Sequence, residues 1–179
     1  MNRSVGICIM FLALLLAAAL PKNTNAQDAS ASDAREIKKQ VRKMLKSGTD
    51  FFDEGLVDSA TAQFQGVLAL DSVNPDAFYY LARVTLTHGD SAATLADLKE
   101  AVVKAPRSFR LKRFLARMHL ALNEPAEAQK LAEEVLMIRQ RDGEALYLKG
   151  CALLMAGDSA QAVQILGQAL EITEARGKK

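Results

Sequence analysis

The chain has 179 residues, of which half are apolar and a quarter are charged, and it contains no tryptophan. These values exclude a disordered or fibrous chain and indicate one soluble, mostly helical domain. The first 26 residues contain two of the 23 Lys and Arg residues, Arg3 and Lys22, and no acidic residue. Without them the chain has 21 basic and 21 acidic residues and is formally neutral. A neutral domain lacks the positive field of a nucleic-acid-binding protein, so no nucleic-acid partner is expected.

Residues 1–26 have the pattern of a secretory signal peptide. Arg3 precedes a continuous apolar run, Val5–Leu20, and the segment has no acidic residue. Pro21 ends the run, and small or short side chains lead to a predicted cleavage site after Ala26. The run has 16 residues, fewer than the roughly 20 of a membrane span. We therefore predict export to the periplasm or the cell exterior and no membrane span in the mature chain. An uncleaved N-terminal anchor is the alternative.

Residues 27–40 are predicted to form a linker and the start of the first helix. Gln27–Ala31 is small and polar, which is typical of a flexible linker. Asp33 is followed three residues later by Glu36, the spacing of a capping box at a helix start. The helix that begins here is expected to run through Val41.

Turn residues recur every 34 positions from there on, at Gly55, Gly89, Asn123 and Gly157. Glycine and asparagine tolerate the left-handed conformation that ends a helix. Helix-capping residues recur with the same spacing at Asn74, Ser108 and Asp142. Further caps are expected directly after three of the turns, at Asp58-Ser59, Asp90-Ser91 and Asp158-Ser159. These series predict four helix-turn-helix units, 41–74, 75–108, 109–142 and 143–176, and a tail at 177–179.

Small residues occupy equivalent positions in each unit. The first helices carry Gly48, Ala82, Ala116 and Gly150, and the second helices carry Ala60, Thr94, Ala128 and Ala162. A small side chain lets a neighbouring helix approach closely, so these positions are predicted to lie inside each helix pair.

The pattern resembles the tetratricopeptide repeat (TPR) family over residues 41–176. The most telling stretches are Ala77-Phe78 with Leu81-Ala82, Gly89-Asp90, Ala101–Pro106 and Glu144–Leu170. The resemblance implies an all-α fold, an α-solenoid in which antiparallel helix pairs stack into a right-handed superhelix with a concave groove. Lys112 and Lys149 depart from the family because these positions are usually apolar.

Positive charge is concentrated in the third unit. Residues 101–123 contain six Lys or Arg and no acidic residue, and Arg110, Arg113 and Arg117 share one helical face. By the family resemblance, the first helices line the groove with Tyr79, Tyr80, Arg83, Arg110, Arg113, Phe114, Arg117 and Tyr147. Arginines among aromatic rings suit an acidic peptide. The alternative is that the arginines form only a solvated helix surface.

Motifs for catalysis and for cofactor binding are missing from the sequence. It has no phosphate-binding loop, dinucleotide fingerprint or nucleophile elbow. His88 and His119 are 31 positions apart and form no metal-ligand spacing. Cys151 has no evident base nearby, and as the only cysteine after position 26 it has no disulfide partner. We predict no enzyme activity, no catalytic residue, no cofactor and no metal.

The last helix raises a second functional hypothesis. Its apolar residues are Val163, Ile165, Leu166, Leu170 and Ile172, and only the tail 177–179 follows the fourth unit. Repeat arrays usually end on a polar capping helix, so part of this apolar set is expected to be uncovered. The sequence thus predicts an exported adaptor that binds a protein segment and assists assembly of an envelope or secretion complex. The alternative is a structural protein that self-associates through its last helix.

Overall fold

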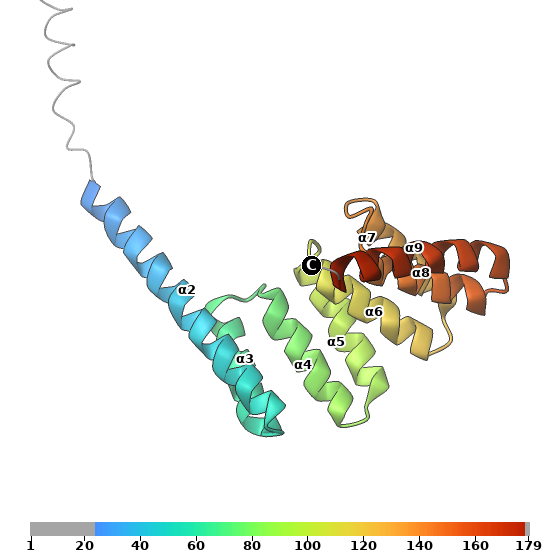
Figure 1. Cartoon of the computed structure of the whole chain (residues 1–179). Coiled ribbons are helices and arrows are strands. Elements are labelled where there is room, and N and C mark those ends of the chain that lie inside the picture. The colour runs from blue at the N-terminus through green and yellow to red at the C-terminus, as the bar shows by residue number, and fades with distance from the viewer. Residues whose placement is uncertain (1–23, 178–179) are drawn as a thin grey trace, which may run out of the picture. The chain divides into compact units, whose positions relative to one another are not determined.

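The computed structural model describes residues 24–177, and every regular element in this part is an α-helix (Figure 1). The chain divides into two units, residues 1–40 and 41–179. The helices are α2 (Thr24–Asp53), α3 (Val57–Leu70), α4 (Pro75–Thr87), α5 (Ser91–Lys104), α6 (Phe109–Ala121), α7 (Pro125–Leu136), α8 (Gly143–Met155) and α9 (Ser159–Gly177). The predicted α-solenoid of helical repeats is confirmed.

The N-terminal expectations have different outcomes. The apolar run of the predicted signal peptide lies outside the described residues. The predicted linker 27–31 lies within α2, which is already helical at Thr24, so the linker prediction is wrong. This stretch contains neither glycine nor proline, and its alanines favour the helix that the following residues continue.

The turns between paired helices have the predicted conformation. Backbone φ is +77° at Gly55, +80° at Gly89 and +89° at Gly157, and Asn123 has φ +62°. Asparagine is among the few residues with a side chain that enter this region readily. The 34-residue spacing therefore reflects a repeated left-handed helix ending.

Most predicted helix caps are present. The side chains of Asn74, Ser108 and Asp142 accept hydrogen bonds from the first backbone N–H groups of α4, α6 and α8. Asp90 caps α5 in the same way. The prediction for the first unit is wrong, because α3 begins at Val57 and its N-cap residue, Leu56, makes no side-chain cap bond.

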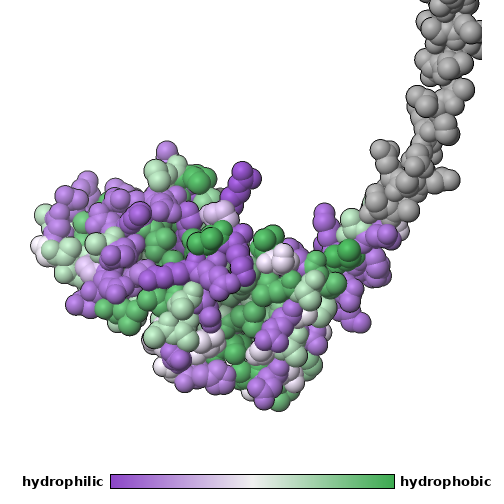
Figure 2. Space-filling model, turned by 180° about the vertical axis from the view of Figure 1, so that it is seen from behind, coloured by the Kyte–Doolittle hydropathy of each residue, from purple (hydrophilic) through white to green (hydrophobic). Residues whose placement is uncertain are grey.

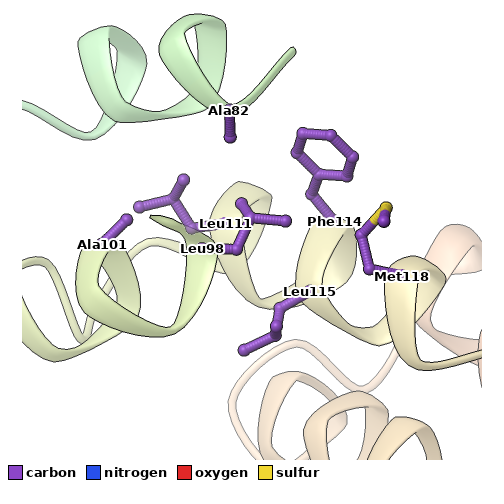
Figure 3. Packing of buried hydrophobic residues seen from close by; sticks show 7 residues of the cluster. All are labelled: Ala82, Leu98, Ala101, Leu111, Phe114, Leu115 and Met118. Atoms are coloured by element: carbon purple, nitrogen blue, oxygen red, sulfur yellow. The ribbon is translucent and has the colours of Figure 1, made fainter. Parts of the chain in front are cut away.

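Large side chains of the second helices fill the space beside the small residues of the first helices. A Cβ atom added to Gly48 would lie 2.6 Å from the Phe64 ring, and one added to Gly150 would lie 2.6 Å from Leu166. The same packing continues between repeats: Leu98 of α5 and Leu111 of α6 are fully buried in one core cluster (Figure 3). A large-to-small change at such a site costs about 2–5 kcal/mol.

The two basic residues that depart from the family pattern each form an ion pair with the preceding helix or the one that follows. Lys112 Nζ lies 2.7 Å from Glu134 Oε2, and Lys149 Nζ lies 2.9 Å from Glu133 Oε1. Their aliphatic stems cover apolar surface while the charged ends are neutralised. The fold therefore accommodates lysine at positions that the family usually makes apolar.

The first helices of consecutive repeats lie closer together than the second helices. Helix α4 contacts α6, and α6 contacts α8, whereas α5 makes no contact with α7, nor α7 with α9, within the described part of the chain. Residues 75–177 therefore bend toward the side of the first helices. In repeat arrays such an inner face is the usual binding surface.

Candidate functional site

Five side chains from three first helices gather into an aromatic–arginine cluster, defined as Phe52, Tyr79, Tyr80, Arg83 and Arg110. The Arg110 guanidinium lies 3.6 Å from the centre of the Tyr79 ring, and Arg83 lies 4.4 Å from that of Phe52. The Tyr80 ring is 5.3 Å from Tyr79 and 5.5 Å from the Arg83 guanidinium. Cation–π contacts of this kind hold both arginines against the rings.

The core beneath the cluster fixes its geometry. Tyr80 stacks on the buried Phe64 ring, with centroids 4.9 Å apart and planes 6° apart. Tyr79 packs on Phe114, with ring centroids 5.4 Å apart. Phe64 and Phe114 are buried, so each tyrosine packs on a ring that the core holds in place.

The two arginines of the cluster differ in their acidic partners. Arg110 Nη1 donates a 2.8 Å hydrogen bond to Asp76 Oδ1, and both side chains remain more than 40% exposed. Burial alone would lower the pKa of Arg110, but hydrogen bonds with Tyr80, Asp76 and Tyr79 raise it above the ordinary value. Arg83 forms no ion pair with any carboxylate among residues 31–177, whose side chains the structure describes.

Arg113 and Arg117 are engaged with the next repeat. Arg113 Nη1 donates to Asp142 Oδ2 at 2.5 Å, and its Nε lies 2.8 Å from Glu144 Oε2 without hydrogen-bond alignment. Arg117 pairs with the other oxygen of Glu144. The Arg113 side chain is only 18% exposed and Asp142 only 8%. Arg113 is therefore a link between α6 and α8, and it is not free to bind a ligand as the sequence suggested.

The expectation for Phe114 is also corrected, because the residue is 4% exposed and belongs to the core cluster. It projects from α6 among Ala82, Leu111 and Met118 (Figure 3). Its position one residue after Arg113 turns it from the inner face toward the helix pair.

Tyr147 is 55% exposed and lies apart from the aromatic–arginine cluster in the fourth repeat. A hydrogen bond with Cys151 raises the pKa of its phenol. The structure thus brings Tyr79, Tyr80, Arg83 and Arg110 together but leaves Tyr147 beside the last helix.

The apolar residues predicted for self-association divide into two groups. Val163 and Leu170 are 69% and 60% exposed. Ile165, Leu166 and Ile172 are half-buried, and Leu166 and Ile172 lie over Gly150 and Gly143 of α8. The surface view shows hydrophobic areas between hydrophilic ones (Figure 2), so apolar side chains are not confined to the core.

Sequence reasoning missed Phe52 and the acidic partners Asp76, Asp142 and Glu144. One signal was available: Asp76 and Arg110 are one repeat length apart, so opposite charges occupy equivalent positions of neighbouring repeats. The placement of Phe52 had no comparable signal, because its contact with Arg83 joins the end of α2 to the middle of α4.

Two further features of the described residues bear on metal binding and on membrane insertion. Within residues 31–177, no three His, Cys, Asp or Glu side chains gather in a way that could hold a metal ion. None of the helices in that range combines the length and apolar character needed to cross a bilayer.

Comparisons with solved structures agree with the repeat fold. The crystal structure of MamA is 23% identical, with a TM-score of 0.64 over 78% of this chain and 81% of that one. A thermophilic TPR protein from Thermus thermophilus is 22% identical, with a TM-score of 0.63 over 75% of each chain. Pseudomonas aeruginosa pilF is 16% identical, with a TM-score of 0.69 over 78% of this chain and 64% of that one. At these identities the structures show a shared fold.

The comparison with family models concerns the sequence itself. The family model of the tetratricopeptide repeat matches residues 45–109, 81–142 and 115–177. No curated protein is significantly similar to the chain. The family match nevertheless spans most of the sequence and coincides with the helical repeats of the structure. The chain therefore belongs to the tetratricopeptide repeat family.

Proposed function

We propose that this chain is an exported adaptor that holds an acidic segment of another protein against the aromatic–arginine cluster. The tetratricopeptide repeat fold itself indicates a scaffold for protein–protein interaction, and members of the family are generally not catalytic. The proposal of export rests on the signal-peptide pattern of residues 1–26. In that location the adaptor would assist assembly of an envelope or secretion complex.

The observation that carries the proposal is that Arg83 is held against an aromatic ring without an acidic partner. Its guanidinium lies over the Phe52 ring and has no carboxylate partner among the described residues. Stacking uses the flat face of the guanidinium and leaves its N–H groups directed outward in the plane. Those donors match the geometry of a carboxylate, which arginine binds with two parallel hydrogen bonds.

Arg110 extends the same site by one repeat. Its only acidic partner in the described part is Asp76, which is 49% exposed. A ligand carboxylate can therefore share or replace that partner at little cost, because exposed ion pairs contribute only about 0–1 kcal/mol. Tyr79 and Tyr80 between the two arginines offer rigid aromatic surface for the intervening ligand residues.

The test compares three versions of residues 27–179 as bait in an envelope extract. The first is unchanged, the second carries Arg83→Glu and Arg110→Glu, and the third carries Arg107→Glu and Arg141→Glu. Both variants replace two arginines by glutamates, so they have the same net charge. Arg107 and Arg141 are exposed loop residues, so their change should not disturb the fold. Arg113 stays unchanged, because its reversal would set a carboxylate against Asp142.

A protein captured by the unchanged bait and by the loop variant, but lost from the cluster variant, would support the proposal. Its binding should weaken as salt is raised, since exposed charges are screened. Circular dichroism must show that the cluster variant is folded. Equal capture by all three baits would contradict the proposal and leave the arginines as a solvated helix surface.

A further inference from the structure

Helix α9 continues beyond the point where the earlier second helices end. Helix α5 ends at Lys104, whose counterpart 68 residues later is Ile172, yet α9 extends five residues further to Gly177. In the second repeat the corresponding stretch turns and ends at Ser108, which caps the next helix. Its counterpart is Arg176, which offers no acceptor for a cap.

A cavity of about 570 Å³ lies between α8 and α9, and its lining includes Glu144, Tyr147, Leu166, Ala169, Leu170 and Thr173. Two repeats earlier, 68 positions back, the counterparts of the five residues from Tyr147 to Thr173 in this lining are Tyr79, Leu98, Ala101, Val102 and Ala105. All five of these belong to, or pack against, the core cluster to which α6 contributes. The cavity is therefore the fourth-repeat counterpart of the surface that α6 covers in the second repeat.

The packing of α6 against α4 and α5 shows what kind of helix this surface accepts. Helix α6 inserts Leu111, Phe114, Leu115 and Met118, at positions i, i+3, i+4 and i+7 (Figure 3). In the fourth repeat the counterpart surface is uncovered, with Leu170 60% and Tyr147 55% exposed. An amphipathic helix with the same apolar spacing fits this groove.

The charge of the groove sets a second requirement for the bound helix, a basic residue near its start. Where α6 begins, Arg110 pairs with Asp76, and the counterpart of Asp76 at the cavity is Glu144. Glu144 is 38% exposed and already pairs with Arg113 and Arg117. A carboxylate has about four acceptor positions, so it can receive a further donor. A basic residue just before the first apolar position of an incoming helix would meet it.

A second copy stacked head to tail does not meet these requirements. In such a stack, the first helix of the second copy would take the place of α6. Its counterparts of Leu111, Phe114, Leu115 and Met118, 68 positions earlier, are Lys43, Lys46, Ser47 and Asp50. All four are polar, and three are exposed. Burying them against the apolar cavity would leave polar groups unpaired.

We propose that the groove between α8 and α9 binds an amphipathic helix of another protein, with apolar residues at i, i+3, i+4 and i+7 and a basic residue directly before the first of them. The bound helix takes the place that a further first helix would have in the array. Apolar burial against Leu170 and Tyr147 supplies the affinity, and Glu144 sets the direction of the helix.

The probe is a fluorescent peptide with the sequence of residues 109–121, which is the α6 helix itself. It should bind the full chain, and Leu170→Glu should weaken binding by at least about tenfold, because a fully buried leucine contributes that much or more. Val163→Glu is the matched control, since Val163 is 69% exposed on the same helix and does not line the cavity. A peptide carrying Arg110→Glu should also bind more weakly.

Three results would overturn the proposal: no binding of the peptide, equal binding by the Leu170→Glu and Val163→Glu variants, or a dimer in sedimentation that Leu170→Glu alone converts to a monomer. The last result would assign the groove to a second copy. The Arg83→Glu, Arg110→Glu variant should bind the peptide like the unchanged chain. Failure here is thus distinguishable from failure of the proposed acidic-segment site.

Discussion

The first prediction tests whether Arg113 stabilises the fold through its ion pair with Asp142 and is not a ligand-binding residue. One oxygen of Asp142 accepts a 3.0 Å bond from the Ala145 N–H, and the other accepts from Arg113. Replacing Arg113 by Met keeps the aliphatic contact but leaves a carboxylate oxygen unpaired on a side chain that is 8% exposed. Breaking a fully buried pair costs about 3–5 kcal/mol. Because Arg113 is 18% exposed, water can enter, and we expect a loss of about 2 kcal/mol.

The assay is urea unfolding followed by circular dichroism, with a thermal scan that should show a Tm lowered by about 4–8 °C. Arg117→Met is the control, because Arg117 is 55% exposed and its pair should contribute less than about 1 kcal/mol. Asp142→Asn keeps the cap, since asparagine caps as well as aspartate. A double-mutant cycle should give a coupling of about 1–2 kcal/mol. Equal stability of the Arg113→Met and Arg117→Met variants would refute the reasoning.

Three further predictions concern the fold. Gly157→Ala should lower the free energy of unfolding by about 1–2 kcal/mol in urea titrations, because φ there is +89°. Hydrogen bonds from Lys149 and Gln129 hold the pKa of Glu133 below its ordinary value. The folded-state pKa is thus lower than the unfolded one, so Glu133 stabilises the fold above the unfolded pKa, and this contribution is lost as pH falls through the folded pKa. Glu133→Gln should remove that part of the acid destabilisation in unfolding measured against pH. Replacing both partners, Lys112→Leu together with Glu134→Leu, should leave stability equal or raise it, since apolar side chains often replace a largely buried ion pair without loss.

Each of these has a result that would contradict it. An unchanged unfolding midpoint for Gly157→Ala would mean that the turn adjusts its backbone. Identical acid titrations with and without Glu133→Gln would show that this carboxyl contributes nothing to stability. A loss of more than about 2 kcal/mol for the Lys112→Leu, Glu134→Leu double variant would show that the ion pair is essential to the local packing.

Features that depend on neighbouring residues were predictable from the sequence. The 34-residue turn series, the caps at Asn74 and Ser108, and the small residues facing each helix partner follow from backbone sterics and helical period. Such rules act within a few residues, so one sequence is sufficient to apply them.

The candidate site required the tertiary structure. The sequence placed Arg110, Arg113 and Phe114 on one ligand-binding surface by family resemblance. The fold pairs Arg113 with Asp142, buries Phe114 and adds Phe52 beside Arg83. These outcomes depend on how far one helix pair is rotated against the next and on which side chains then meet. Helical periodicity says which face a residue occupies within its own repeat, whereas the charges and rings that it meets across the interface come from residues about 30 positions away, where only packing decides.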